Sequence, residues 1–322
     1  THWTAFYIIL VLLGIVGNTT VVGVILDSVF KDPSGVRNSD IILMNMALSN
    51  LLVSVLRNVL LVISDLRLEV RSWMGIDVCH VLMGVWVWLR SVNVWSTFFL
   101  SAFHFQTLRR VTPPPGTVHG PRRPPKTLLI SLGLIWFLNL IYAIPAHIYS
   151  TNGNKNSTET LMLVSSTTRP LLGCVWNFPS SYDGLAYATT SMVIHEILPI
   201  ILMAITNLGS LYTLYTHGRT HNPAHMTQDA PVIKRIPAER RAAKVILALI
   251  VLFIGSWGTS IISINYFNYN RGLSAGFLLV IARFANTIFI AISPIVLAVG
   301  HRRLRALLLH VLSCLFFKKQ SN

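Results

Sequence analysis

Charged residues are scarce in this chain. Asp, Glu, Lys and Arg make up 11% of its 322 residues, while 53% are hydrophobic. A soluble domain carries about twice that charged fraction, so the composition excludes a soluble multidomain protein and indicates an integral membrane protein built as one compact helical unit. Acidic residues are the rarest, with 11 against 26 lysines and arginines. Because the placement of this positive charge matters more than its sum in a membrane protein, we expect the lipid bilayer, and no nucleic acid, as a partner.

The common catalytic and cofactor motifs are also missing. His195-Glu196 begins like the helix of a zinc protease, but Pro199 replaces the second histidine, so the i, i+4 ligand pair is absent. Three histidines at that spacing within 217–225 are interrupted by glycine and proline, which prevents one helix from aligning them. The chain has no Gly-rich phosphate loop, and its last apolar block has no lysine for a retinal Schiff base. We therefore expect no catalytic residue, no metal and no cofactor.

Seven apolar blocks are long enough to cross a bilayer as helices. No repeat relates one block to another, and none resembles a cleaved signal peptide. The expected fold is an all-α membrane protein, a seven-transmembrane-helix bundle over 1–299, followed by a short cytosolic amphipathic helix and tail over 300–322. The blocks are 5–29, 39–64, 77–108, 127–149, 186–215, 242–267 and 275–299.

The stretch 79–110 is expected to be the central helix of the bundle. It runs about thirty residues without a proline, begins at Cys79 and ends at Arg109-Arg110. Arg90 and Asn93 lie in its middle. A charge at that depth is costly in lipid, so this helix should be buried among the other helices.

Lysine and arginine counting predicts the orientation. Eighteen of the 26 lie in the first, third and fifth connections and the tail, whereas five lie in the other connections. The positive-inside rule then places the N-terminus outside and the C-terminus in the cytosol. The three that remain, Arg57, Arg90 and Arg283, fall inside apolar blocks.

The cysteines agree with this orientation. Cys79 and Cys174 both belong to the outer, oxidising face, where a disulfide can persist; the alternative is two free thiols. Asn156 begins an Asn-Ser-Thr glycosylation sequon in the same outer connection. Cys314, near the membrane on the cytosolic side, is either a palmitoylation site or a plain buried thiol.

Several ionisable residues lie within the apolar blocks at similar depths, and such residues usually mark a functional site. One interpretation is a cationic, aromatic-lined site for a small organic anion. The other is a set of internal ion pairs, chiefly Glu196 with an arginine; yet one carboxylate cannot neutralise three guanidinium groups. The residues predicted to bind the ligand are Arg57, Trp86, Arg90, Asn93, His195, Glu196 and Arg283.

A second set of polar residues lies deeper in the blocks. Asn18, Asn50 and Ser293 can share one cluster in the inner half of the bundle. Interhelical hydrogen bonding, at about 0.6 kcal/mol per contact, is the simpler explanation, and an ion site is the alternative.

The sequence motifs resemble those of G-protein-coupled receptors. The residues concerned are GIVGN in the first block, MNMALSN in the second, and the pair Cys79 and Cys174. Within that superfamily, VWSTFFLSAFHFQTLRRV and ISPIVLAVGHRRLR resemble vomeronasal type-1 receptors, and especially the fish olfactory receptors related to class A. Bitter taste receptors are similar in the third helix, but they usually end the seventh on a His-Ser pattern where this chain has Ser293-Pro294.

The chain departs from rhodopsin-like receptors at three motifs. Phe103-His104-Phe105 stands where that class has Asp-Arg-Tyr, and Asn50 stands in place of an aspartate in the second helix. Ser293-Pro294 begins the segment that replaces Asn-Pro-x-x-Tyr. The usual arginine lock, tyrosine switch and sodium site therefore lack their main residues, as is normal for the vomeronasal type-1 group.

The resemblance implies a chemosensory receptor, multi-pass in the plasma membrane, in which a small odorant or pheromone enters from outside. The arginines within the apolar blocks predict that this ligand is anionic. It also implies that the inner surface engages a heterotrimeric G protein of the inhibitory or another subtype. An anion transporter or channel is the competing class, but an odd number of helices without an inverted repeat argues against it. The residues expected to face the G protein are His104, Arg109, Arg110, Arg240, Arg241 and Lys244.

Overall fold

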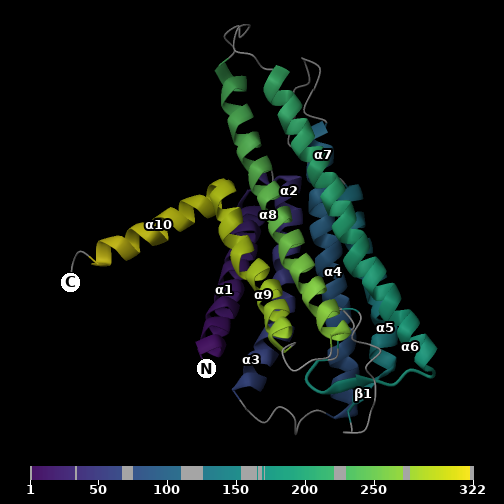
Figure 1. Ribbon diagram of the computed structural model, residues 1–322. Helices are drawn as coiled ribbons and strands as arrows, with labels where there is room; N and C mark the ends of the chain where they lie inside the picture. Colours follow the sequence, from purple (N-terminus) through teal and green to yellow (C-terminus); the bar gives the residue numbers. More distant parts are fainter. Residues whose placement is uncertain are drawn as a thin grey trace.

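A computed structural model of the protein describes residues 2–32, 35–66, 75–109, 126–153, 165, 169, 171–220, 230–270 and 276–319. Within these residues, seven helical spans are long and apolar enough to cross a membrane, which confirms the expected bundle (Figure 1). The spans are Trp3–Lys31, Asn38–Ser64, Ile76–Arg109, Lys126–Ile148, Ser181–Thr216, Ala243–Phe267 and Gly276–Gly300.

Two of the seven spans are composite, because a π-helical segment interrupts each of them. In chain order the elements are α1 (His2–Lys31), α2 (Asn38–Val53), η2 (Ser54–Val59), α3 (Leu60–Asp65), α4 (Ile76–Arg109), α5 (Lys126–Ile148), β1 (Ser150–Asn152), β2 (Cys174–Trp176), α6 (Ser181–Met192), η5 (Val193–Ile197), α7 (Leu198–Thr220), α8 (Ala230–Tyr269), α9 (Gly276–Gly300) and α10 (Arg302–Lys319).

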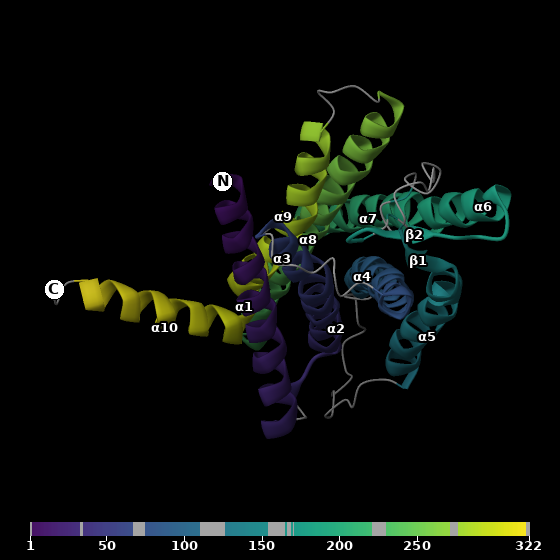
Figure 2. The ribbon, with the colours of Figure 1, turned by 90° about the horizontal axis from the view of Figure 1, so that it is seen from below.

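Helix α4 is the central helix, as its buried charge predicted. It packs against α2, α5, α7 and α8, and Figure 2 shows it between α2 and α5 when the bundle is viewed along its length. In its most apolar stretch 67% of residues are buried, against at most 50% in any other span. The interior of the bundle is therefore organised along α4.

The two π-helical segments coincide with ionisable residues. Arg57 lies in η2, and His195 and Glu196 lie in η5. Pro199 gives a local reason for η5, because it has no N–H to donate to the carbonyl of residue 195. Single-turn π segments occur often at functional sites. Both segments are therefore candidate parts of a functional site.

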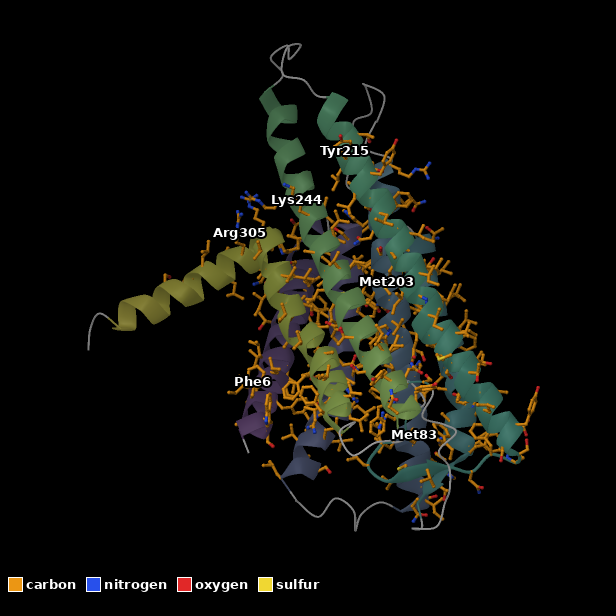
Figure 3. The ribbon with its side chains drawn as sticks, in the orientation of Figure 1. Phe6, Met83, Met203, Tyr215, Lys244 and Arg305 are labelled. Carbon is orange, nitrogen blue, oxygen red and sulfur yellow. A yellow bond between two sulfur atoms is a disulfide. The ribbon has the colours of Figure 1, made fainter. Side chains whose placement is uncertain are left out.

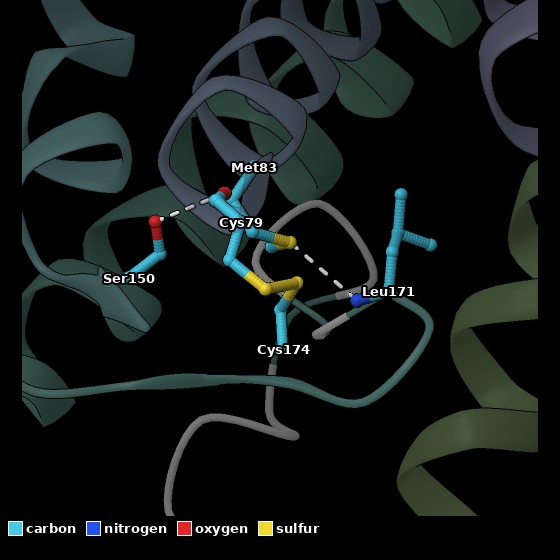
Figure 4. Close-up of a disulfide and its surroundings, with 5 residues drawn as sticks. All are labelled: Cys79, Met83, Ser150, Leu171 and Cys174. Atoms are coloured by element: carbon cyan, nitrogen blue, oxygen red, sulfur yellow. Dashed lines mark hydrogen bonds between the residues drawn. A yellow bond between two sulfur atoms is a disulfide. The ribbon is translucent and has the colours of Figure 1, made fainter. Parts of the chain in front are cut away.

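A disulfide and a short hairpin close one end of the bundle. Cys79, near the start of α4, is bonded to Cys174 of β2, which confirms the predicted disulfide (Figure 4). Strand β2 pairs antiparallel with β1, and the Ser150 hydroxyl donates to the Cys79 carbonyl at 3.2 Å. Gly173 enters β2 with φ of +87°, a left-handed conformation that favours glycine. We call this the disulfide end; the N-terminal end of α1 lies there too (Figure 1).

Helix α10 marks the opposite end and extends sideways from the bundle (Figure 1). Leu304 is buried against the bundle, whereas Arg305 is exposed. His301, just before α10, lies 3.4 Å from the Asp40 carboxylate at the start of α2. We call this the α10 end; Lys244 lies there, far from Met83 at the disulfide end (Figure 3).

Candidate ligand-binding site

Four arginines from four separate segments lie close enough for their charges to interact. They are Arg57 of η2, Arg90 of α4, Arg283 of α9, and Arg169 of the connection between β1 and β2. The charge of Arg57 acts on Arg90 and Arg169, and the charge of Arg283 acts on Arg57. We call these four residues the arginine group.

Arg90 is the most buried member, with 3% of its surface exposed. Its guanidinium carbon lies 3.2 Å from the ring centroid of Trp257 and 5.7 Å from that of Trp86. The guanidinium carbon of Arg57 lies 5.5 Å from the same Trp86 centroid. The two guanidinium carbons are therefore at most about 11 Å apart, and both lie within cation–π range of the same indole ring.

The hydrogen-bond donors around Arg90 lack acceptors. Within the described part of the chain, Nε of Arg90 and the indole nitrogens of Trp86 and Trp257 are buried without a hydrogen-bond partner. A buried donor left unsatisfied costs about 1–3 kcal/mol. All three atoms are donors, so the group they would satisfy is an acceptor, and an acidic group supplies acceptors together with the opposite charge.

Arg283 and Arg57 are linked through α1. The guanidinium carbon of Arg283 lies 3.8 Å from the ring centroid of Tyr7. The Tyr7 hydroxyl donates to Oδ1 of Asn58 at 3.1 Å, and Asn58 follows Arg57 in η2. The packing of α1 against η2 therefore fixes the separation of these two arginines.

Residues from the connection between the two strands reach the arginine group. The Ser165 hydroxyl donates to Oε1 of Glu196 at 2.8 Å, and both residues are fully buried. Glu196 in turn acts electrostatically on Arg90. Burial lowers the pKa of Arg169 from its usual value, and the like charge of Arg57 lowers it further. The connection thus contributes both a hydroxyl and a cation.

His195 is directed away from the arginine group although its chain neighbour Glu196 is not. Its Nε2 lies 3.0 Å from Oδ1 of Asn139, and its ring is 4.4 Å from the ring of Tyr142. Both contacts are to α5. Ligand binding by His195 stays a prediction that this geometry does not favour.

Asn93 also lies apart, one turn of α4 beyond Arg90 towards the α10 end. Its amide donates to Oδ1 of Asn50 at 2.6 Å and to the Ser49 hydroxyl at 3.0 Å. Asn50 reaches both Asn18 and Ser293 at 3.4 Å. The expected polar cluster is therefore present, with Asn93 as a further member, and ligand binding by Asn93 stays a prediction.

At the α10 end, the motif that replaces Asp-Arg-Tyr packs against α7. A Cβ on Gly209 would lie 2.6 Å from the ring of Phe105, so this glycine permits close approach of α4 and α7. The hydroxyls of Ser101 and Thr206 share a hydrogen bond of 2.6 Å on the same interface. His104 is 9% exposed and in this conformation faces the interior, so its contact with a G protein stays a prediction.

Of the other residues predicted to face a G protein, Arg109, Arg241 and Lys244 are exposed at the α10 end. The guanidinium carbon of Arg109 lies 5.6 Å from the ring of Phe105. Arg110, the side chain of Arg240 and the Asn156 sequon lie outside the described residues.

Sequence reasoning missed three contributors to the site. Trp257 was one apolar residue among many, because an aromatic side chain within an apolar block gives no signal of its own. Arg169 and Ser165 were treated as loop residues; the one available signal was their closeness in sequence to Cys174, which ties that connection to α4.

Seven membrane-spanning helices, with a disulfide from the third span to the connection after the fourth and a buried cationic group below it, define a heptahelical receptor. Comparison with known proteins agrees. The family of the 7 transmembrane receptor (rhodopsin family) matches residues 17–295. The Danio rerio protein named olfactory receptor class A-like protein 4 is 41% identical over 316 residues, which cover 98% of this chain and 91% of that protein.

The chain belongs to the rhodopsin family of seven-transmembrane receptors. The resemblance to fish olfactory receptors related to class A, first indicated by the motifs, is confirmed by the zebrafish relative. Membership also confirms a receptor, not an enzyme, and a multi-pass protein of the plasma membrane.

Proposed function

We propose that the protein is a chemosensory G-protein-coupled receptor that binds a small anionic odorant or pheromone at the arginine group. The observation that carries the ligand class is the buried Arg90, whose Nε has no hydrogen-bond partner in the described part of the chain, beside two indole N–H groups that also have none there. The name of the zebrafish relative, an olfactory receptor class A-like protein, supports the chemosensory role.

The disulfide end faces outside in this proposal, and the α10 end faces the cytosol. Ligand entering at the disulfide end then reaches Arg57, Trp86, Arg90 and Arg283. Binding shifts the bundle towards a conformation whose α10 end is open, to the extent that the ligand binds that conformation more tightly. The exposed cations Arg109, Arg241 and Lys244 then meet a heterotrimeric G protein and the acidic inner leaflet.

The test of the ligand class compares variants at two arginines in cells that report G-protein activation. Arg90→Ala and Arg283→Ala should weaken responses to carboxylate and sulfate odorants at least about tenfold, because each loses a charge-assisted hydrogen bond. Responses to neutral odorants should change less. Surface expression measured on the same cells controls for folding.

Equal losses for charged and neutral odorants at normal surface expression would refute an anionic ligand. Recording current in parallel with nucleotide exchange tests whether the protein is a receptor or an anion channel. An odorant-evoked current without nucleotide exchange would favour an anion channel and overturn the proposal.

A further inference from the structure

Two histidines from neighbouring helices lie against each other at the disulfide end, apart from the arginine group. His80 lies near the start of α4, and His147 lies in the last turn of α5. Their ring centroids are 5.8 Å apart, and the two ring planes are inclined at 66°. His147 is exposed and His80 is half-buried, so an ion in solution can reach the pair.

Close packing of α4 and α5, which lie side by side (Figure 2), fixes this arrangement. Gly84 follows His80 by one turn on the same face of α4, and a Cβ on Gly84 would lie 2.9 Å from the Cβ of His147. The residue before His80 is Cys79, whose sulfur forms the disulfide and whose carbonyl accepts the Ser150 hydroxyl. Both histidines are therefore attached to a rigid frame.

A hydrogen bond sets the tautomer of His147. Its Nδ1 lies 3.0 Å from the carbonyl oxygen of His80. Because a carbonyl oxygen only accepts, Nδ1 carries the proton in this contact and the lone pair of the neutral ring is on Nε2. Histidines that bind metal ions almost always donate their other N–H to a carbonyl, a carboxylate or water, which orients the ring. The Nε2 atom of His147 is thus prepared to bind a metal ion.

The separation of the two rings fits one shared ion. A Zn²⁺ ion about 2.0 Å from a ring nitrogen lies about 3.2 Å from the ring centre, so two rings at the tetrahedral angle have centres about 5.2 Å apart and two opposite rings about 6.4 Å apart. The observed 5.8 Å lies between these values. Within the described part of the chain, no group of three or more histidine, cysteine, aspartate or glutamate side chains could hold a metal. Water therefore has to complete the coordination.

We propose that His80 and His147 bind a Zn²⁺ ion, or a chemically similar transition-metal ion, with water as the remaining ligands. Imidazole suits zinc and copper, whereas Mg²⁺ prefers oxygen ligands. The bound ion joins α4 to α5 beside the disulfide and stabilises the folded receptor. The two histidines are 67 residues apart in the sequence, so no spacing motif indicated a metal here. The inference does not depend on the proposed function, because neither histidine belongs to the arginine group.

The experiment measures thermal unfolding of the full-length receptor, purified without a histidine tag, in sub-millimolar ZnCl₂ or MgCl₂. An ion that binds the folded state and not the unfolded state raises the melting temperature. The expected result is a rise of about 2 °C or more with Zn²⁺ and no rise with Mg²⁺. This comparison in the wild-type receptor needs no variant to fold.

Variants at each histidine then locate the ion. His80→Gln and His147→Gln should each lose most of the rise with Zn²⁺, because the ion needs both rings. His80→Gln keeps the backbone carbonyl that His147 contacts, and the melting temperature without metal shows whether each variant is folded. His310→Gln, the same substitution at an exposed site on α10, is the matched control and should keep the full rise.

Three outcomes would overturn the inference. The first is no rise of the wild-type melting temperature with Zn²⁺, and the second is an equal rise with Zn²⁺ and Mg²⁺. The third is an undiminished rise in a folded His80→Gln or His147→Gln variant, because the ion would then bind elsewhere in the chain. Each of these outcomes leaves the proposed function standing, since the arginine group takes no part in them.

Discussion

At Arg90, the proposed binding of an anion and the stability of the ligand-free receptor are expected to conflict. Its charge is buried among apolar helices, where the ring face of Trp257 at 3.2 Å and the opposite charge of Glu196 compensate it in part. A desolvated cation–π contact of this kind contributes about 2 kcal/mol. Removing a guanidinium from water costs several kcal/mol, so the contact offsets part of the cost and leaves the rest for a ligand to offset.

We therefore expect Arg90→Met to stabilise the ligand-free receptor while it abolishes responses to anions. Methionine fills similar volume without a charge, and replacing buried charge with apolar groups is often stabilising by about 1–4 kcal/mol. The melting temperature of the purified receptor should rise by about 2 °C or more. Arg90→Lys, which keeps the charge, should give no such rise. A lower melting temperature in Arg90→Met would mean that the guanidinium is fully compensated within the protein.

At the same scale, the sequence was informative where a residue contradicted its surroundings. Arg57, Arg90 and Arg283 could be recognised as candidate site residues because each is a charge within an apolar block. Trp257 and Arg169 were not, because a tryptophan is ordinary in a membrane helix and an arginine is ordinary in a connection. Their roles depend on which segments pack together, and hydropathy along the chain does not contain that information.

At the scale of elements, hydropathy located all seven spans but not their full helical extent. The apolar block 242–267 lies within α8, which begins at Ala230 and ends at Tyr269. Backbone hydrogen bonds continue the helix beyond the membrane, whereas hydropathy detects only the part in lipid. The π-helical segments were also missed, because a local change in hydrogen-bond register does not alter the composition of a long apolar run. At η5, Pro199 was the one residue in the sequence that could have indicated such a change.

We expect the interface between α4 and α7 at the α10 end to hold the inactive conformation in place of the absent arginine lock. We expect Gly209→Ala to raise basal G-protein activation several-fold. The added methyl would lie 2.6 Å from the ring of Phe105, and overpacking of this size costs about 1–3 kcal/mol. Because opening of this end relieves the clash, the conformational equilibrium shifts towards the active state. Nucleotide exchange without ligand measures the effect.

A compensating substitution makes this prediction specific. Phe105→Leu in the Gly209→Ala background removes the ring atoms that the methyl meets and should return basal activation to the wild-type level. Unchanged basal activity in Gly209→Ala, at normal surface expression, would show that the contact between α4 and α7 does not hold the inactive conformation.

At the scale of the whole molecule, the arginine group, the disulfide and the hairpin lie at one end, and the exposed cations and α10 lie at the other. The separation assigns one end to ligand and the other to a cytosolic partner, provided that the bundle is oriented as its lysines and arginines predict. Eighteen of these residues lie in the connections of the α10 end and the tail, against five at the disulfide end. Such an imbalance favours the α10 end in the cytosol.

Cysteine labelling of intact cells tests this orientation. Asp183→Cys, at the exposed start of α6 near the hairpin, should react with a membrane-impermeant thiol reagent without permeabilisation. Lys244→Cys, exposed at the α10 end, should react only after permeabilisation. The opposite pattern would place the arginine group on the cytosolic side, where an external odorant has no direct access to it. The orientation is thus the condition on which the proposed route of the ligand depends, and it can be measured before any ligand is known.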